Sequence, residues 1–260
     1  MNRVLQLKFW GADVFILALV WALAYAAHMD TTMVTPGPLV VTSSAAWVWV
    51  VAGRLYRGLR EEDSYGAGYY RSHLVPMLLL LFGVTMAAIW IQLYYVGQAL
   101  LGYSFGVLFF LLVGTIARLL GEIGKELRRL LFALAAAQLC AMPAFYYSFI
   151  HTPVNQLLSA PLCYVGLLFY LAARETERIE RDGEMDTLTV CGMLALVCAT
   201  LYAAWILPHY ERGVCLAVAV GAGCLQGYAQ LSSRWPREYA GGFCGLALLV
   251  PAFLLWFRLL

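Results

Sequence analysis

Long hydrophobic runs dominate this chain, and short polar stretches separate them. With a window of about twenty residues, nine apolar spans stand out. Their approximate bounds are 10–28, 37–53, 74–96, 103–117, 130–150, 155–173, 187–207, 214–231 and 240–257. A helix of about 20 apolar residues crosses the hydrocarbon core of a bilayer. The pattern therefore predicts an all-α, polytopic integral membrane protein with nine transmembrane helices.

Composition supports this interpretation. The chain is 63% hydrophobic and 12% charged, whereas a soluble domain carries about 25% charged residues. The net charge of +2 gives no reason to expect a nucleic-acid partner, so membrane lipids are the expected surroundings. Arg3 and Lys8 before the apolar run 9–27 resemble a signal peptide, but we expect a retained first helix. A bacterial inner membrane and an organelle membrane both fit, and the sequence does not specify an oligomeric state.

The polar stretches predict which end of each helix faces the cytoplasm. Alternate stretches, starting with the N-terminus, hold 15 of the 17 basic residues and 12 of the 15 carboxylates. The positive-inside rule then predicts a cytoplasmic N-terminus and long cytoplasmic loops at 54–73, 118–129 and 174–186. The loop 118–129 is expected to form a short interfacial helix. Four spans separate the first and third loops, which suggests one domain over 1–260, built from two four-helix pseudo-repeats plus a ninth helix.

The loop 174–186 has the densest charge, with three arginines and six carboxylates in thirteen residues. Asp182 and Asp186 form a D-x-x-x-D pair, and Glu175 lies about two helical turns before Asp182. Carboxylates with this spacing can share one face of a helix. Because Mg²⁺ prefers oxygen ligands and binds phosphates, the segment is a candidate Mg²⁺ site for a phosphorylated substrate.

The layout resembles the UbiA superfamily of intramembrane prenyltransferases, which have acidic loops after the second and sixth of nine helices. The run Arg181-Asp-Gly-Glu-Met-Asp-Thr-Leu-Thr-Val190, followed by Gly192, is similar to the second acidic motif of that family. The first motif of the family is N-D-x-x-D or D-x-x-x-D. This chain departs from it and has Arg57-Gly-Leu-Arg-Glu-Glu-Asp-Ser-Tyr65 there.

The resemblance implies a UbiA-like helical bundle that uses an isoprenyl diphosphate and Mg²⁺ at a cytoplasm-facing site. The implied catalytic residues are Asp182, Asp186 and Glu175, and the implied metal ligands are Asp182, Asp186, Glu61 and Asp63. The implied substrate-binding residues are Arg71, Lys125, Arg128 and Arg178 for the phosphates, with Tyr94 and Tyr146 as aromatic partners of the allylic cation.

Two other functions stay open. A UbiA-type terpene cyclase ionises the same substrate and closes a ring without an acceptor. A non-catalytic lipid-binding or scaffold protein with a degenerate site fits the altered first motif. A transporter or channel is less well supported, because such proteins carry ionisable residues within their spans and only Asp13 comes close to that position.

Overall fold

The structure is a computed structural model that describes residues 12–28, 36–60, 67–96, 101–148, 160–180, 187–207, 209–231 and 240–257. Every secondary-structure element in these ranges is a helix, so the all-α fold class is confirmed for the described part of the chain. The elements are α2 (Ala12–His28), α3 (Pro36–Arg60), α4 (Ala67–Ser72), α5 (Leu74–Ile91), η1 (Gln92–Val96), α6 (Leu101–Ile116), η3 (Ala117–Leu120), α7 (Gly121–Ser148), α8 (Ala160–Glu180), α9 (Thr187–Ile206), α10 (His209–Leu231) and α11 (Ala240–Trp256).

Each predicted apolar span lies on one of the long helices. The helical nature of the described part of each span is therefore confirmed, and parts of the segments predicted as cytoplasmic loops, 54–73, 118–129 and 174–186, are helical as well. The helix α3 continues to Arg60, α7 starts at Gly121 and α8 continues to Glu180. The interfacial helix expected at 118–129 is mostly the first part of α7. These extensions form because Arg, Lys, Glu and Leu are good helix formers, whatever their hydropathy.

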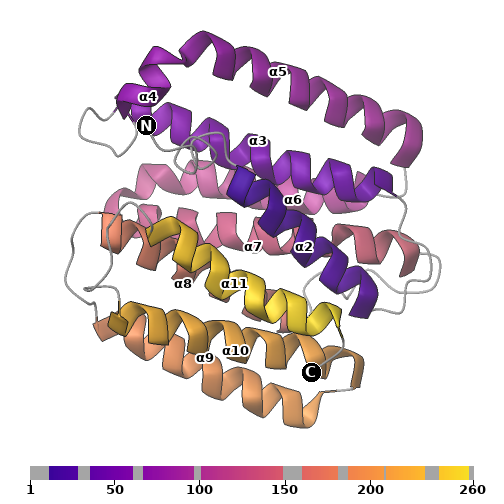
Figure 1. The fold of residues 1–260 in the computed structure, drawn as a ribbon, viewed down its shortest axis with the longest axis vertical. Coiled ribbons are helices and arrows are strands. Elements are labelled where there is room, and N and C mark those ends of the chain that lie inside the picture. Colours follow the sequence, from indigo (N-terminus) through magenta and orange to yellow (C-terminus); the bar gives the residue numbers. More distant parts are fainter. Residues whose placement is uncertain are drawn as a thin grey trace.

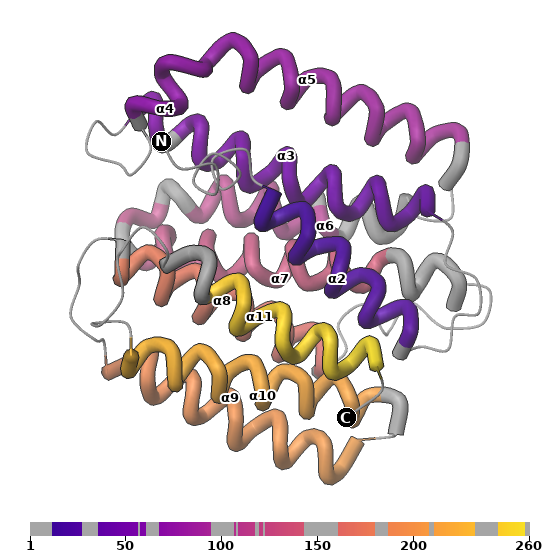
Figure 2. Tube along the Cα trace, viewed as in Figure 1, coloured from indigo at the N-terminus to yellow at the C-terminus, as the bar shows by residue number. Residues whose placement is uncertain are grey.

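The helices form an up-and-down bundle (Figures 1 and 2). Consecutive long helices run in opposite directions, and α5 lies at one edge while α9 and α10 lie at the other. The C-terminal ends of α3, α8 and α10 therefore share one end of the bundle with the N-terminal ends of α7 and α9. We call this the charged end, because the arginines and carboxylates of the extensions 54–60, 121–129 and 174–180 lie there.

The main core lies where α2, α7, α8, α10 and α11 meet. Trp21 of α2 is fully buried, and its indole N–H donates a hydrogen bond of 3.1 Å to the carbonyl oxygen of Leu248 in α11. A second cluster joins α3, α4 and α5 around Trp47, Val51 and Met77. The five-helix contact fixes α7 and α8 against each other, and these two helices carry most of the polar groups considered below.

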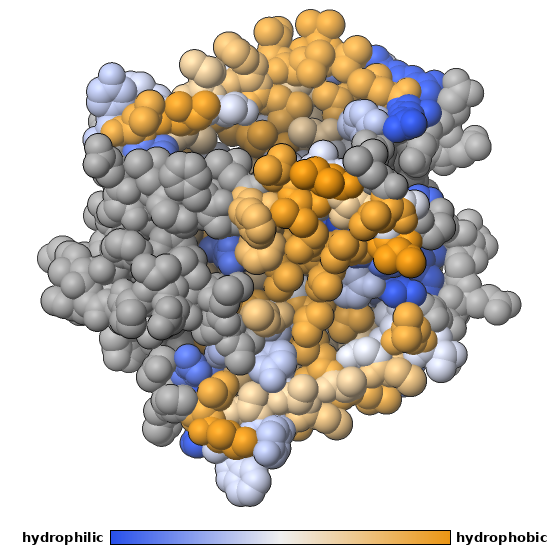
Figure 3. Space-filling view, turned by 180° about the vertical axis from the view of Figure 1, so that it is seen from behind, coloured by the Kyte–Doolittle hydropathy of each residue, from blue (hydrophilic) through white to orange (hydrophobic). Residues whose placement is uncertain are grey.

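The surface is largely apolar between the ends of the bundle. Within the described residues, four helices are long and apolar enough to cross a membrane: Pro36–Arg60, Leu74–Tyr94, Thr187–Ile206 and Glu211–Leu231. Large side chains such as Leu79, Phe82 and Trp205 point outward. Figure 3 shows a mainly hydrophobic surface with hydrophilic residues mostly along one edge of that face.

A bilayer explains exposed apolar area of this extent, which monomeric soluble proteins rarely have. The described residues therefore fit an integral membrane protein. The nine-span topology, the cytoplasmic N-terminus and the pseudo-repeat stay predictions.

Candidate functional site

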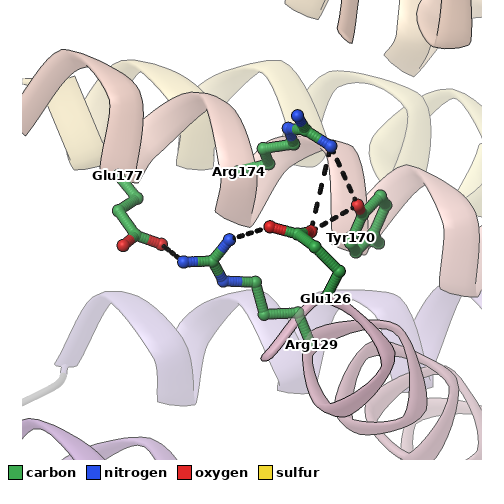
Figure 4. Close-up of polar contacts among 5 residues, drawn as sticks. All are labelled: Glu126, Arg129, Tyr170, Arg174 and Glu177. Carbon is green, nitrogen blue, oxygen red and sulfur yellow. Dashed lines mark hydrogen bonds and ion pairs between the residues drawn. The ribbon is translucent and has the colours of Figure 1, made fainter. Parts of the chain in front are cut away.

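Two helices supply a polar network at the charged end. The spacing of the residues creates it: Glu126 and Arg129 are three apart on α7, while Tyr170, Arg174 and Glu177 follow one another at four and three residues on α8. Both spacings put side chains on a single helix face. Because α7 and α8 pack against each other, the two polar faces meet (Figure 4).

Arg129 is the centre of this network. Its guanidinium forms ion pairs with Glu126 on its own helix and with Glu177 on α8. The Tyr170 hydroxyl donates a 2.7 Å hydrogen bond to Glu126 Oε2, and Arg174 donates to the Tyr170 oxygen at 3.1 Å. Two guanidinium groups thus balance two carboxylates. The network therefore fixes α7 to α8 and adds little net charge.

A second ion pair lies on another face of α8. The Glu175 carboxylate is 1% exposed, and both of its oxygens accept hydrogen bonds from Arg178, at 2.9 Å from Nε and 2.5 Å from Nη2. The hydrogen bond to Glu175 holds the pKa of Arg178 above its usual value, so Arg178 stays charged.

The acidic residues of the two predicted metal motifs lie outside the described residues. Asp182 and Asp186 fall in 181–186, between α8 and α9, and Glu61 and Asp63 fall in 61–66, between α3 and α4. Both segments connect helices whose joined ends lie at the charged end (Figure 1). The side chain of Tyr146 also lies outside the described part.

The predicted phosphate-binding residues share the charged end. Lys125 and Arg128 are on the first turns of α7, next to Glu126 and Arg129, and Arg71 is on α4. Lys125 and Arg71 are exposed and Arg128 is half-buried. The structure thus brings these cations to the end where Arg178 lies, as the charge pattern predicts.

Comparison of the chain with protein-family models, with curated proteins and with solved structures finds no match.

Tyr94 does not join the predicted cations. It follows α5, which runs from α4 at the charged end to the other end of the bundle (Figure 1). Its side chain is 73% exposed, and its ring lies 5.5 Å from that of Trp90, which also points outward. As placed, Tyr94 lies on the outer surface.

Sequence reasoning missed a buried aromatic cluster. The rings of Trp21 and Tyr25 on α2 lie 6.1 Å apart, and the Phe169 ring of α8 meets Trp21 edge-on at 5.5 Å. The four-residue spacing of Trp21 and Tyr25 was a usable signal, since it predicts a shared helix face. The partner on α8 was not predictable, because only the tertiary fold brings it close.

The sequence suggested that Asp13 could pair with a basic residue, but it did not identify Arg54 as the partner. The Arg54 guanidinium contacts both carboxylate oxygens of Asp13, at 3.3 and 3.0 Å, and joins α2 to α3 at the charged end. The position of Asp13 near the start of an apolar span was a signal for a basic partner. The sequence did not indicate which of the many arginines it would be.

The described carboxylates do not form a metal site. No group of three or more His, Cys, Asp or Glu residues within the described ranges is arranged to hold a metal ion. Glu175 does not fit a ligand role as placed, because both oxygens already bind Arg178 and the group is buried. Asp182 and Asp186 fit Mg²⁺ by their chemistry, since oxygen ligands suit that ion.

Proposed function

We propose that this chain is a UbiA-like membrane prenyltransferase that binds an isoprenyl diphosphate and Mg²⁺ at the charged end of the bundle. The observation that carries the proposal is where the helices that flank the D-x-x-x-D segment end. The helix α8 ends at Glu180 and α9 begins at Thr187, both at the charged end (Figure 1). The six residues 181–186, which include Asp182 and Asp186, connect these two ends in the sequence.

The electrostatics of the charged end support this proposal. A diphosphate carries several negative charges, which must be neutralised before the allylic C–O bond can break. Lys125, Arg128 and Arg71 supply cations at this end, and bound Mg²⁺ would supply further positive charge, held by Asp182 and Asp186. Arg178 is less suited to bind phosphate than the sequence suggested, because its guanidinium already forms an ion pair with the Glu175 carboxylate.

The packing assigns a structural role to the α7–α8 network. Arg129 ties Glu126 to Glu177 across the two helices that precede the acidic segment. This contact fixes the last turns of α8, from which the segment 181–186 departs. In the proposed enzyme, the network would hold the helix end that precedes the acidic segment, and its groups need not touch substrate.

One observation favours a second candidate, a non-catalytic lipid-binding protein. Glu126, Glu175 and Glu177, on α7 and α8 at the charged end, are each paired with an arginine. Such pairing holds helices together and leaves fewer oxygens for a metal. A terpene cyclase shares the proposed ionisation step and differs in needing no acceptor.

The proposal predicts that Asp182→Asn abolishes Mg²⁺-dependent release of diphosphate. The purified protein is incubated with labelled prenyl diphosphates of several chain lengths, with Mg²⁺ and a panel of aromatic acceptors. Removing one carboxylate charge from a two-carboxylate site should lower the rate by at least about 100-fold. Released diphosphate and prenylated product are both measured.

Glu184→Gln is the matched control, since it neutralises a carboxylate of the same segment outside the D-x-x-x-D pair. It should retain activity. Release without acceptor, accompanied by a hydrocarbon product, would indicate the cyclase. Binding of the prenyl diphosphate without any release, and without dependence on Mg²⁺, would indicate the non-catalytic protein and would rule out the transferase.

A further inference from the structure

Two buried hydroxyls on α3 have no hydrogen-bond partner among the described residues. Thr42 and Ser43 are neighbours in the chain, both are 0% exposed, and the Oγ atoms of both are buried and unpaired. A buried hydroxyl without a partner is unfavourable, because folding has removed its hydrogen bonds to water. These two groups therefore need a partner that the described helices do not supply.

Threonines elsewhere in the bundle satisfy their hydroxyls within their own helix. Such a hydroxyl usually donates to the carbonyl oxygen four residues earlier. Bonds of this kind, 2.7–2.9 Å long, are formed by Thr85, Thr115, Thr176 and Thr200. Thr42 does not form this bond, so its hydroxyl is available to a group outside its own helix.

The two hydroxyls lie at a packed interface of the bundle, where α3 contacts α2 and α7. Trp49 lies two turns beyond Thr42 on the same face of α3, and its ring centroid is 4.7 Å from that of Phe132 in α7. Thr42 is therefore on the side of α3 that faces α7. Ser44 is on another side, next to α2 and α5. Ser43 lies between these two directions.

The same level of α2 carries a third hydroxyl of this kind. The ion pair of Asp13 with Arg54 sets the register of the antiparallel helices α2 and α3. Tyr25 is 12 residues beyond Asp13, and Thr42 is 12 residues before Arg54, so both lie about 18 Å from the pair. The Tyr25 hydroxyl is also buried and has no partner within the described part of the chain. One level of the bundle thus holds three such groups.

We propose that this level contains an internal hydration site, in which an ordered water binds the Thr42 and Ser43 hydroxyls where α3 meets α2 and α7. Water suits these groups because it both donates and accepts hydrogen bonds, and buried waters bind about two to four polar partners. An apolar ligand would leave the hydroxyls unpaired. The site lies far along α3 from the charged end, so it is separate from the proposed transferase site and does not depend on it.

The first test detects the bound water in the full-length protein, embedded in phospholipid bilayers, by solid-state NMR with transfer of magnetisation from water. The signals of Thr42 and Ser43 should receive this magnetisation. Thr200 is the matched control, because it is also 0% exposed but bonds to the carbonyl oxygen of Leu196, and it should receive none. The proposal is overturned if Thr42 and Ser43 receive no more than Thr200 does.

The sign of a stability change gives an independent test. Thr42→Val removes the hydroxyl and keeps the shape of the side chain, so the bound water would lose a partner. The unfolding equilibrium constant in detergent should rise about tenfold, which is about 1.4 kcal/mol. Thr115→Val is the matched control on an exposed helix face and should change it less. A Thr42→Val protein more stable than the unaltered one would contradict the proposal, because removing an unpaired buried hydroxyl is favourable.

Discussion

Replacing Arg178 with methionine is expected to lower the free energy of unfolding by about 3–5 kcal/mol. The reason is the burial of its partner. Glu175 is 1% exposed, and both of its oxygens bind the Arg178 guanidinium. Without Arg178, this carboxylate either stays buried without its counter-ion or takes up a proton, and both outcomes are costly. Unfolding in denaturant, followed in detergent, measures the change.

A double-mutant cycle separates the pair from the packing around it. Changing Glu175 to leucine in the Arg178→Met background removes both charges, so most of the lost stability should return. Arg60→Met is the matched control. Arg60 donates a 2.8 Å hydrogen bond to the exposed Tyr56 hydroxyl, and its loss should cost less than about 1 kcal/mol. Equal losses for Arg178→Met and Arg60→Met would contradict the account of a buried pair.

Gly124→Ala is expected to destabilise the start of α7 by about 3 kcal/mol. A Cβ atom at this position would lie 1.8 Å from the carbonyl oxygen of Ala117 in η3. Backbone cannot move aside as a flexible side chain can, so the first turn of α7 must shift away from η3. The shift should also weaken the contacts of Glu126 and Arg129 with α8, which begin less than two turns later. Thermal unfolding measures the loss.

Gly83→Ala supplies the matched control for this substitution. Gly83 lies within α5, and nothing is within 4 Å of the position its Cβ would take. The substitution should leave the free energy of unfolding unchanged or raise it by up to about 1 kcal/mol, because alanine restricts the unfolded chain more than glycine does. If Gly124→Ala were as stable as Gly83→Ala, the close approach of α7 to η3 would not be required for the fold.

Hydropathy predicted the helices well and their ends poorly. The apolar runs coincide with long helices because a helix of about twenty apolar residues is long enough to cross the hydrocarbon core of a bilayer. The ends were missed at 54–60, 121–129 and 174–180 because hydropathy falls where charges begin, whereas helix propensity does not. The extension of α8 could have been predicted from Glu175 and Arg178, which have the i,i+3 spacing of a helical ion pair.

Which side chains point into the bundle was harder to predict than which segments are helical. The helix α5 is apolar on all sides, so the sequence contains no stripe to indicate its inner face, and it did not indicate that Tyr94 would be 73% exposed. The contact of Tyr170 with Glu126 joins residues 44 positions apart, and no local pattern predicts such a pair. The clustering of cations at one end was predictable, because it follows from the alternation of loops.

The proposed diphosphate site is tested most directly by replacing Mg²⁺ with Mn²⁺ and recording its electron paramagnetic resonance spectrum with a non-hydrolysable prenyl diphosphate analogue. The account predicts a protein-bound Mn²⁺ signal that requires the analogue, persists in Glu184→Gln and disappears in Asp182→Asn. A spectrum of free Mn²⁺ in the unaltered protein at saturating analogue, or a bound signal that Asp182→Asn leaves unchanged, would contradict it.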